Sequence, residues 1–196
     1  MREVELKAVL DSWDSRRARL VRAGAVRVFE GRLEDRRYDA IDRSLAARDI
    51  VLRLRIYRDA DGVRAELEFK GPTGYERGYK VREEIGSTVA DPEAIALVLT
   101  GLGYIVTREI DREIEQFELG GAIVRFERYP RMDDLVEIEG EPEALERAIE
   151  ALGIPREAYT ADRLTDFAAR YEARTGKRAA LADVELSADA PVFRER

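Results

Sequence analysis

The sequence predicts an α+β fold that is built on a large antiparallel sheet. Polar and apolar residues alternate along several segments, and a period of two is typical of half-buried strands. Asp61-Gly62 and Gly120-Gly121 are turn signals between such segments, so we expect hairpins in which neighbouring strands run antiparallel. Capped helical segments stand between the hairpins, and the sheet is large enough to curl or close.

The first half of the chain contains one helix and most of the expected strands. Ser12 is a suitable N-cap for a helix that continues through Arg22, and Gly24 ends it because glycine readily takes the left-handed backbone found just after a helix. The pattern over 25–40 is ambiguous and leans toward a strand. Clearer patterns predict strands at residues 2–10, 50–58, 64–70 and 79–85.

Two helices in the second half share one kind of N-terminus. Asp91-Pro92-Glu93 and Glu141-Pro142-Glu143 each place a proline at the first helical position and an acid after it. Glycines end both helices, at Gly101 or Gly103 and at Gly153. The remaining pattern predicts strands at 104–119, 122–129 and 135–139 and a helix at 157–175.

The chain has 196 residues, a length that fits one domain. No repeat or linker divides residues 1–176, and we expect a loosely held tail at 177–196, where small and charged residues mix. No apolar stretch approaches the ~18 residues that a membrane span needs, and the first residues lack the apolar segment of a signal peptide. The expectation is therefore a cytoplasmic protein without a membrane partner.

Cysteine and histidine are both absent from the sequence. Their absence excludes zinc sites with thiolate or imidazole ligands, cysteine nucleophiles, Ser-His-Asp triads and disulfide bonds. Any bound metal must be a hard cation with oxygen ligands, such as magnesium, calcium or manganese. General acid or base chemistry would fall to Asp, Glu, Lys, Tyr or water.

Charged side chains are paired on the polar faces of the expected strands. Glu3 with Glu5, and Glu137 with Glu139, place carboxylates two residues apart on one face, where they repel each other unless a cation lies between them. Similarly spaced strands carry the cations Lys7, Arg53, Arg55 and Lys70. A solvated face would explain such charges on any one strand. A closed sheet would instead bring both sets inside, as a site for a metal and a polyanion.

An ordered set of short motifs runs along the chain. It begins with Glu3-Val4-Glu5-Leu6-Lys7 and continues with Tyr38-Asp39, Leu52-Arg53-Leu54-Arg55, Leu67-Glu68-Phe69-Lys70-Gly71-Pro72, Arg82-Glu83-Glu84 and Val136-Glu137-Ile138-Glu139-Gly140. Together these motifs resemble the CYTH domain family, the triphosphate tunnel metalloenzymes. The resemblance covers roughly residues 2–170, which is nearly the whole chain.

The resemblance implies a closed antiparallel eight-stranded β-barrel, a triphosphate tunnel, with helices packed outside it. Family members bind a nucleoside, thiamine or inorganic triphosphate in this tunnel with Mg²⁺ or Mn²⁺. By position in the motifs, the metal site would comprise Glu3, Glu5, Glu84, Glu127, Glu137 and Glu139, with Glu83 as the alternative to Glu84. The phosphates would be contacted by Lys7, Arg53, Arg55, Lys70, Arg82 and Arg112. Catalysis would rest on Glu5, Lys7 and Glu137.

Several positions depart from the family pattern. The usual Lys-x-Arg on the strand before the Gly-Gly turn is Arg112-Glu113-Ile114, so one cation is missing or is supplied elsewhere. Glu127 replaces an Asp, and Asp133-Asp134-Leu135 replaces Gly-x-Phe. The family's Ser-Tyr is replaced near Asp162-Arg163. These departures leave the metal carboxylates in place but leave the identity of the substrate open.

Three functions fit these observations. The leading interpretation is a metal-dependent phosphohydrolase that acts on inorganic triphosphate, thiamine triphosphate or a nucleoside triphosphate. The alternatives are a class IV-type adenylyl cyclase, which converts ATP to cyclic AMP and pyrophosphate, and a non-catalytic polyphosphate- or nucleotide-binding module. A net charge of -7 argues against a nucleic-acid partner, and we expect the arginine-rich segment 16–22 to form a solvated face. A homodimer is left open.

Overall fold

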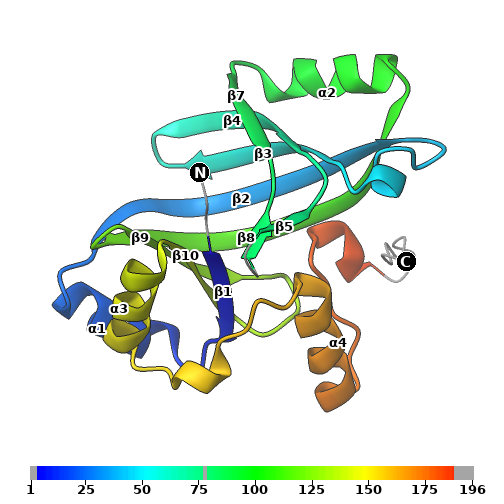
Figure 1. Ribbon diagram of the computed structural model, residues 1–196. Helices are drawn as coiled ribbons and strands as arrows, with labels where there is room; N and C mark the ends of the chain where they lie inside the picture. Colours follow the sequence, from blue (N-terminus) through cyan, green and yellow to red (C-terminus); the bar gives the residue numbers. More distant parts are fainter. Residues whose placement is uncertain (1–3, 77–78, 188–196) are drawn as a thin grey trace. The chain divides into compact units, whose positions relative to one another are not determined.

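Eight strands form one antiparallel sheet in this computed structural model, which describes residues 4–76 and 79–187 (Figure 1). They are β1 (Val4–Val9), β2 (Val26–Ala40), β3 (Val51–Asp59), β4 (Gly62–Lys70), β7 (Glu84–Val89), β8 (Tyr104–Leu119), β9 (Ala122–Arg128) and β10 (Leu135–Gly140). Their hydrogen-bonded order is β1-β10-β9-β8-β2-β3-β4-β7. A separate two-stranded ladder joins β5 (Gly74–Glu76) to β6 (Tyr79–Val81). The predicted α+β class and antiparallel sheet are confirmed.

The strand order begins at β1 and ends at β7. Among the described residues, no hydrogen-bonded ladder joins these two strands, so the sheet is not closed by hydrogen bonds. The closed barrel that the family resemblance implies therefore stays a prediction.

The chain forms two compact units, and β2 and β8 run through both of them. The terminal unit comprises residues 4–31 and 112–187 of the described chain, and the central unit comprises residues 32–111. Each unit has its own apolar core.

In the terminal unit, two helices lie over one face of the strands. These are α1 (Trp13–Arg22) and α3 (Pro142–Leu152), which lie side by side (Figure 1). Leu20 of α1 and Leu152 of α3 share a core with Phe126 of β9 and Ile138 of β10. Because side chains alternate across a strand, the charged residues between these apolar positions face the other way.

The arginine-rich segment has a structural role beyond that of the expected solvated face. Arg16 Nη1 donates to the main-chain oxygens of Leu152 and Gly153 at 3.0 and 2.8 Å, and Arg19 Nε donates to the oxygen of Ala151 at 3.3 Å. These are carbonyl groups at the end of α3, which have no partner inside the helix. The arginines of α1 therefore cap α3.

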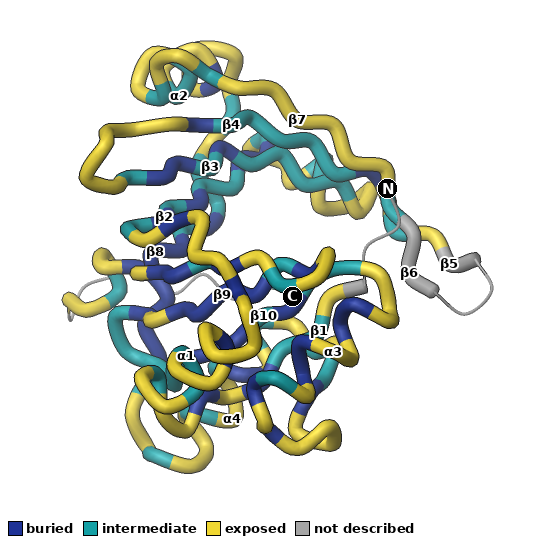
Figure 2. Tube along the Cα trace, turned by 90° about the vertical axis from the view of Figure 1, so that its left-hand side faces the viewer, coloured by how far each residue is buried: buried dark blue, intermediate teal, exposed yellow. Residues whose placement is uncertain are grey.

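The central unit has a second helix-on-sheet core. Leu99 of α2 (Pro92–Gly101) packs with Tyr38, Leu54 and Ala65, which come from β2, β3 and β4. Figure 2 shows buried and half-buried residues along β3 and β4, whereas β7 is exposed over most of its length. Arg53 and Arg55 alternate with the apolar residues of β3 and so belong to the face away from α2.

Two of the predicted elements are divided in the structure. The expected strand at 79–85 is divided at Arg82-Glu83, because β6 pairs with β5 whereas β7 pairs with β4 in the large sheet. The expected helix at 157–175 is a 3-10 turn (Arg156–Ala158) followed by α4 (Leu164–Thr175). Between them, Thr160 exchanges backbone hydrogen bonds with Lys7, which requires extended backbone.

Part of the predicted tail is described. Ala180 pairs with Arg131 through two backbone hydrogen bonds, and Ala180 and Ala182 are fully buried. A 3-10 turn (Asp183–Leu186) follows. The domain boundary at residue 176 stays a prediction.

The helices of the described chain are short, with ten residues in α1 and twelve in α4. Within 4–76 and 79–187, none is both long and apolar enough to cross a membrane. The cytoplasmic location remains a prediction from the sequence.

We predict that Ile138→Ala lowers the free energy of unfolding by about 2–5 kcal/mol, because it removes buried methyl groups and leaves a cavity beneath α3. The measurement is urea denaturation followed by the fluorescence of Trp13, the single tryptophan, whose ring centroid lies 5.4 Å from that of Phe126. Ile41→Ala is the control, since Ile41 is 82% exposed. Equal effects of the two substitutions would contradict the assigned core.

Candidate functional site

The face of β1, β8, β9 and β10 opposite the helices carries charged side chains. We call it the charged face of the terminal unit, and its members are Glu5, Lys7, Arg112, Arg125, Glu127, Glu137 and Glu139. The sequence motifs predict a metal-binding or catalytic role for five of these residues, all except Arg112 and Arg125. Glu3 lies outside the described residues.

Glu137 lies at the centre of this face, between cations on both neighbouring strands. Lys7 of β1 and Arg125 of β9 stand opposite it in the two ladders. Lys7 Nζ is 2.9 Å from Glu137 Oε2, and Arg125 Nη1 is 2.5 Å from Oε1. Burial alone would raise the pKa of Glu137, but the charges of Lys7 and Arg125 outweigh it and hold the pKa well below its ordinary value.

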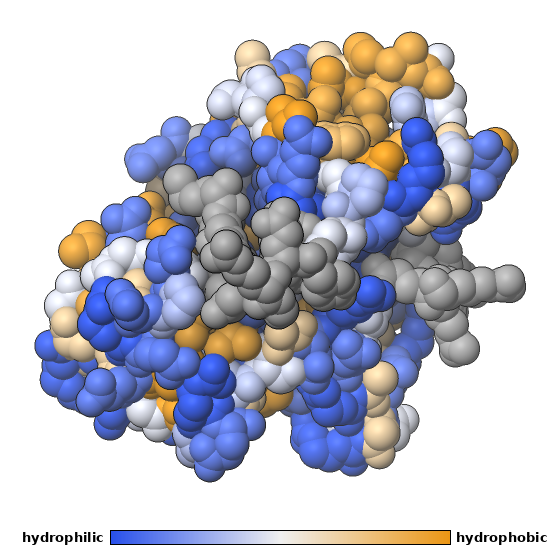
Figure 3. Space-filling model, in the orientation of Figure 1, coloured by the Kyte–Doolittle hydropathy of each residue, from blue (hydrophilic) through white to orange (hydrophobic). Residues whose placement is uncertain are grey.

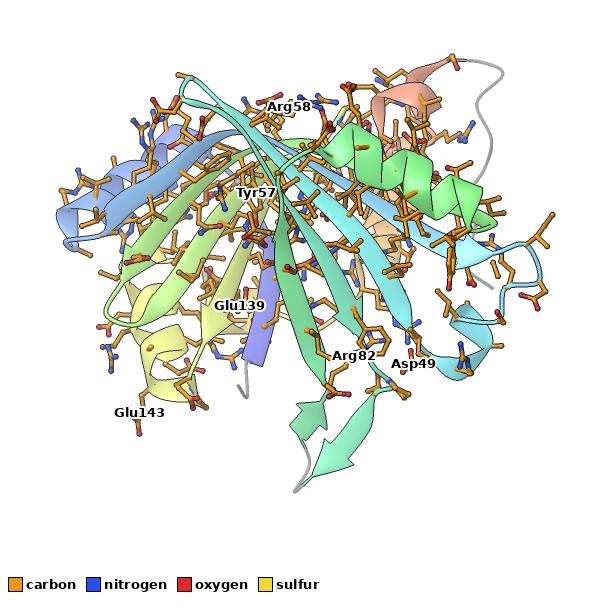
Figure 4. The ribbon with its side chains drawn as sticks, turned by 90° about the horizontal axis from the view of Figure 1, so that it is seen from above. Asp49, Tyr57, Arg58, Arg82, Glu139 and Glu143 are labelled. Atoms are coloured by element: carbon orange, nitrogen blue, oxygen red, sulfur yellow. The ribbon has the colours of Figure 1, made fainter. Side chains whose placement is uncertain are left out.

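Glu5 and Glu139 stand directly opposite each other in the β1–β10 ladder. Figure 4 labels Glu139 on β10, and its neighbour β1 carries Glu5. Opposed residues have Cβ atoms about 4.5–5.5 Å apart, and like charges at that separation destabilise a sheet. Lys7 also contacts the Glu5 carboxylate. Glu5 is half exposed, so this carboxylate pair is open to a further cation.

Arg112 and Glu127 form a buried ion pair in the same unit. Arg112 Nε donates to Glu127 Oε1 at 2.8 Å, and the Tyr129 hydroxyl donates to Oε2 at 2.6 Å. Burial, and then the Glu127 charge, raises the pKa of Tyr129 well above its ordinary value. Both Glu127 oxygens are thus engaged within the protein. The metal role of Glu127 and the phosphate role of Arg112 stay predictions.

The central unit has a charged face of its own around Asp35, which is 2% exposed. Arg55 donates to both Asp35 oxygens, at 2.8 and 3.2 Å, and Arg53 Nε donates to Glu68 at 2.5 Å. Burial alone would lower the pKa of Arg55, but the Asp35 carboxylate raises the pKa of Arg55 well above its ordinary value. Burial also works against the ionised Glu68, yet Arg53 and Arg55 lower its pKa. Arg53 and Arg55, two of the residues predicted to bind phosphate, are therefore held in place by acids.

Arg37 belongs to this face and was not foreseen from the sequence. It stands directly opposite Arg53 in the β2–β3 ladder, so the two side chains share one face of adjacent strands. The preceding residue, Arg36, lies on the opposite face. There its Nη1 is 2.7 Å from Asp111 Oδ1 and its Nε is 3.4 Å from Glu109 Oε2. Four successive charged residues at 34–37 carry no alternation, which is why the sequence did not indicate the face of either arginine.

The remaining predicted residues of the central unit lie in two ion pairs. Lys70 Nζ is 2.8 Å from both oxygens of Glu84, which stands opposite it in the β4–β7 ladder. Arg82 donates to the main-chain oxygen of Asp49 at 2.5 Å and lies beside this residue (Figure 4). Glu84 is thus placed as the partner of Lys70, and its metal role stays a prediction.

No three carboxylates gather into a ready-made cation site in the part of the chain that the structure describes. The donors nevertheless suit a hard divalent ion, because Glu5 and Glu139 offer opposed oxygen ligands and the sequence contains neither cysteine nor histidine. The structure therefore brings Glu5, Lys7, Glu137 and Glu139 together in the terminal unit. It brings Arg53 and Arg55 together in the central unit.

Comparison with protein families gives a match to the CYTH domain over residues 1–158. No curated protein matches the chain.

Several solved structures share the fold. One is from Vibrio parahaemolyticus and is described as a candidate adenylate cyclase, with 18% identity, a TM-score of 0.69, and coverage of 85% of this chain and 97% of that one. The PH1819 protein of Pyrococcus horikoshii has 22% identity and a TM-score of 0.64, and the match covers 83% and 96% of the two chains. A Hippeastrum protein described as a candidate adenylyl cyclase with a dominant triphosphatase activity has 18% identity, a TM-score of 0.61, and coverage of 91% and 97%.

We predict that Glu137→Gln lowers the free energy of unfolding by about 1–3 kcal/mol at pH 7, because Lys7 and Arg125 lose their charged partner. The pKa of Glu137 is lower in the folded protein than its ordinary value of 4.5, so the unfolded state binds the proton more readily and the stabilisation fades as the pH falls below about 4.5. The difference between wild type and variant should therefore shrink in acid.

The measurement is urea denaturation over a series of pH values. Glu118→Gln is the matched control, since Glu118 is an exposed carboxylate of the same unit. A Glu137→Gln difference that stayed constant from neutral pH into acid would refute the ion-pair assignment.

Proposed function

The chain belongs to the CYTH domain family, and from this premise we propose that it is a metal-dependent phosphohydrolase acting on a triphosphate. The family as a whole depends on a metal, and its members are typically enzymes such as triphosphatases. The observation that carries the proposal is the pairing of like charges within each unit. Glu5 opposes Glu139 in one, and Arg37 opposes Arg53 in the other. A metal-triphosphate complex carries a cation that suits carboxylate ligands and anionic oxygens that suit guanidinium groups.

The carboxylates of the terminal unit would hold Mg²⁺ or Mn²⁺. Glu5 and Glu139 are the ligands that we assign first, because they stand opposite each other in the β1–β10 ladder and Glu5 is half exposed. A divalent ion there supplies charge neutralisation to the phosphate oxygens and a means of positioning water. Glu3, Glu84 and Glu127 remain further candidate ligands.

The role that we assign to Glu137 is electrostatic. Its low pKa keeps it ionised at neutral pH and makes it a weak proton acceptor. It would hold Lys7 and Arg125 in position, and Lys7 would then act as a point charge toward a phosphate. Glu5, which is half exposed, is better placed to orient a water molecule.

The arginines of the central unit would bind the phosphates. A guanidinium group can donate two parallel hydrogen bonds to a phosphate, so Arg37, Arg53 and Arg55 together offer several such contacts. The buried Asp35 fixes Arg55, which lowers the entropy lost on binding. Lys70, Arg82 and Arg112 are assigned as additional phosphate contacts. Phosphoryl transfer needs little beyond positioning and charge stabilisation of this kind.

The proposal also requires both charged faces to act on one substrate. A closed eight-stranded tunnel of the family type would satisfy this requirement, and we include such closure in the proposal. The substrate is a small molecule, with inorganic triphosphate, thiamine triphosphate and nucleoside triphosphates as the candidates.

We predict that the protein releases orthophosphate from at least one of inorganic triphosphate, thiamine triphosphate and ATP when Mg²⁺ or Mn²⁺ is present, and that chelation abolishes the release. Products are separated by ion-exchange chromatography. Formation of cyclic AMP and pyrophosphate from ATP would contradict the hydrolase proposal and support the adenylyl cyclase alternative. Tight binding of a triphosphate without turnover would support the non-catalytic binding module instead.

The carboxylate pair is tested in the same assay. Glu139→Gln should lower the rate about a hundredfold or more. Removing one group that stabilises charge in an active site typically raises the activation free energy by roughly 3 kcal/mol. Glu118→Gln on the same unit should leave the rate unchanged. Full activity of the Glu139→Gln variant would contradict the metal assignment.

Arg37 and Arg36 form a matched pair for testing phosphate binding. Arg37→Gln should weaken triphosphate binding about tenfold or more, because a hydrogen bond between charged groups contributes about 1.5–3 kcal/mol. Arg36→Gln should leave binding within twofold of wild type, since Arg36 lies on the other face with Asp111. Isothermal titration calorimetry with inorganic triphosphate measures both. Equal losses would argue that the two arginines act through net charge alone.

A further inference from the structure

β1 lies at one end of the strand order and carries both Glu5 and Lys7. Among the strands that the structure describes, it forms a ladder with β10 alone. Opposed residues of an antiparallel ladder alternate between pairs that exchange hydrogen bonds and pairs that do not. The Lys7 N–H and C=O bond to Thr160, so Lys7 and Glu137 are a pair of the second kind. The hydrogen bonds of the Lys7 main chain therefore go to Thr160 and not to β10.

Thr160 holds Lys7 from the outer edge of β1 (Figure 1). The Lys7 N–H donates to the Thr160 oxygen at 2.8 Å, and the Thr160 N–H donates to the Lys7 oxygen at 2.9 Å. Side chains lie closest in ladder pairs that exchange no hydrogen bonds, which agrees with the 2.9 Å between Lys7 Nζ and Glu137 Oε2. The contact with Thr160 thus fixes the main chain from which the Lys7 ammonium group reaches Glu137.

Thr160 is itself held by the residues on both sides of it. Tyr159 is 6% exposed and belongs to the apolar core of the terminal unit. On the other side, the Asp162 N–H donates to Thr160 Oγ1 at 3.0 Å, and Asp162 Oδ2 is 2.7 Å from Arg170 Nη1 of α4. The segment that reaches Lys7 is therefore attached to the core at one end and to α4 at the other.

α4 has one side that is fixed to the terminal unit and one that is solvated. Phe167 is 4% exposed, and Arg174 Nη2 is 2.5 Å from Asp133, just before β10. Figure 3 shows hydrophilic residues over α4 in the lower part of the view, as expected for the outer side of an amphipathic helix. α4 is thus a support for the segment that contains Thr160.

The place of the Thr160 contact favours a role in the site. A backbone pair on an edge strand can also serve only to cover the edge against pairing with another chain. Here the pair falls on Lys7, whose ammonium group contacts both Glu5 and Glu137. The CYTH match ends at residue 158, so Thr160 lies beyond it.

We propose that Thr160 is a positioning residue, which holds the main chain of Lys7 and thereby places its ammonium group beside Glu5 and Glu137 for contact with a phosphate. The inference rests on the role proposed for Lys7 in triphosphate hydrolysis. Its first test therefore needs no turnover, so that a failure of the inference can be told from a failure of the proposed function.

The first test measures how fast acetic anhydride labels Lys7, which is one of only four lysines in the chain. An arginine-specific protease cleaves after Arg2 and Arg16, so Lys7 is the single lysine of its peptide in mass spectrometry. Thr160→Pro removes the N–H that donates to the Lys7 oxygen. The labelling rate of Lys7 should rise about fivefold, the factor that a typical net hydrogen bond contributes to an equilibrium. The rate of the exposed Lys177 should not change.

Ala161→Pro is the matched control, because it places a proline in the same segment and keeps the Thr160 N–H. Ala161 is exposed, and the Lys7 labelling rate of this variant should stay within twofold of wild type. Thr160→Gly keeps the N–H but loosens the backbone and removes the acceptor of the Asp162 N–H, so a smaller rise is expected. It decides the test if circular dichroism shows that Thr160→Pro does not fold. An unchanged Lys7 rate in the folded Thr160 variant, or an equal rise in Ala161→Pro, would overturn the inference.

The second test compares turnover of the triphosphate that the wild type hydrolyses. Thr160→Pro should lower kcat about tenfold or more, because a small displacement of a charged group in a site can cost this much. Thr160→Ser, which keeps both the N–H and the hydroxyl, should retain the wild-type rate and the wild-type labelling of Lys7. Faster labelling of Lys7 with an unchanged kcat would overturn the positioning role. Absence of turnover in the wild type would contradict the proposed function, and the labelling rates would then decide the Thr160 contact by themselves.

Discussion

The neutralisation of Glu137 is the interaction on which the charged face of the terminal unit depends. This carboxylate is mostly withdrawn from water, and Lys7 and Arg125 approach it from the two neighbouring strands. Taking an ion out of water costs several kcal/mol in a protein, so a carboxylate in the middle of three strands requires cations on both sides. Those cations are available only in the register that places Lys7 and Arg125 opposite Glu137.

Core packing selects the same register. A slip of one residue in β10 would turn Glu137 toward the helices and Ile138 away from them. The apolar core beneath α1 and α3 and the ion pairs on the other face would then be lost together. The central unit follows the same rule, since Leu54 packs beneath α2 while the flanking Arg53 and Arg55 meet Glu68 and Asp35 on the opposite face.

Stability alone does not account for these charged faces. A buried ion pair can often be replaced by apolar residues at no loss of stability. Each unit also sets like charges opposite each other across adjacent strands, Glu5 with Glu139 and Arg37 with Arg53, which a sheet disfavours. In the proposed function, a divalent cation would suit the carboxylates of the terminal unit and phosphate oxygens would suit the arginines of the central unit. This complementarity is the physical reason to regard the faces as binding surfaces rather than as solvated sides of a sheet.

Local alternation was enough to predict the regular strands and the side chains on each of their faces, including Lys7, Glu137 and Arg53, because successive side chains of a strand point to opposite faces. Arg125 carries the same signal between Val124 and Phe126 and could have been found in this way. The neighbours of each strand follow from the folded structure alone, and with them the placement of Glu5 opposite Glu139. The tertiary structure also decided the faces of Arg36 and Arg37 and the break at Arg82-Glu83. These features depend on the pairing of separate segments of the chain. The local periodicity of a sequence does not indicate which segments pair.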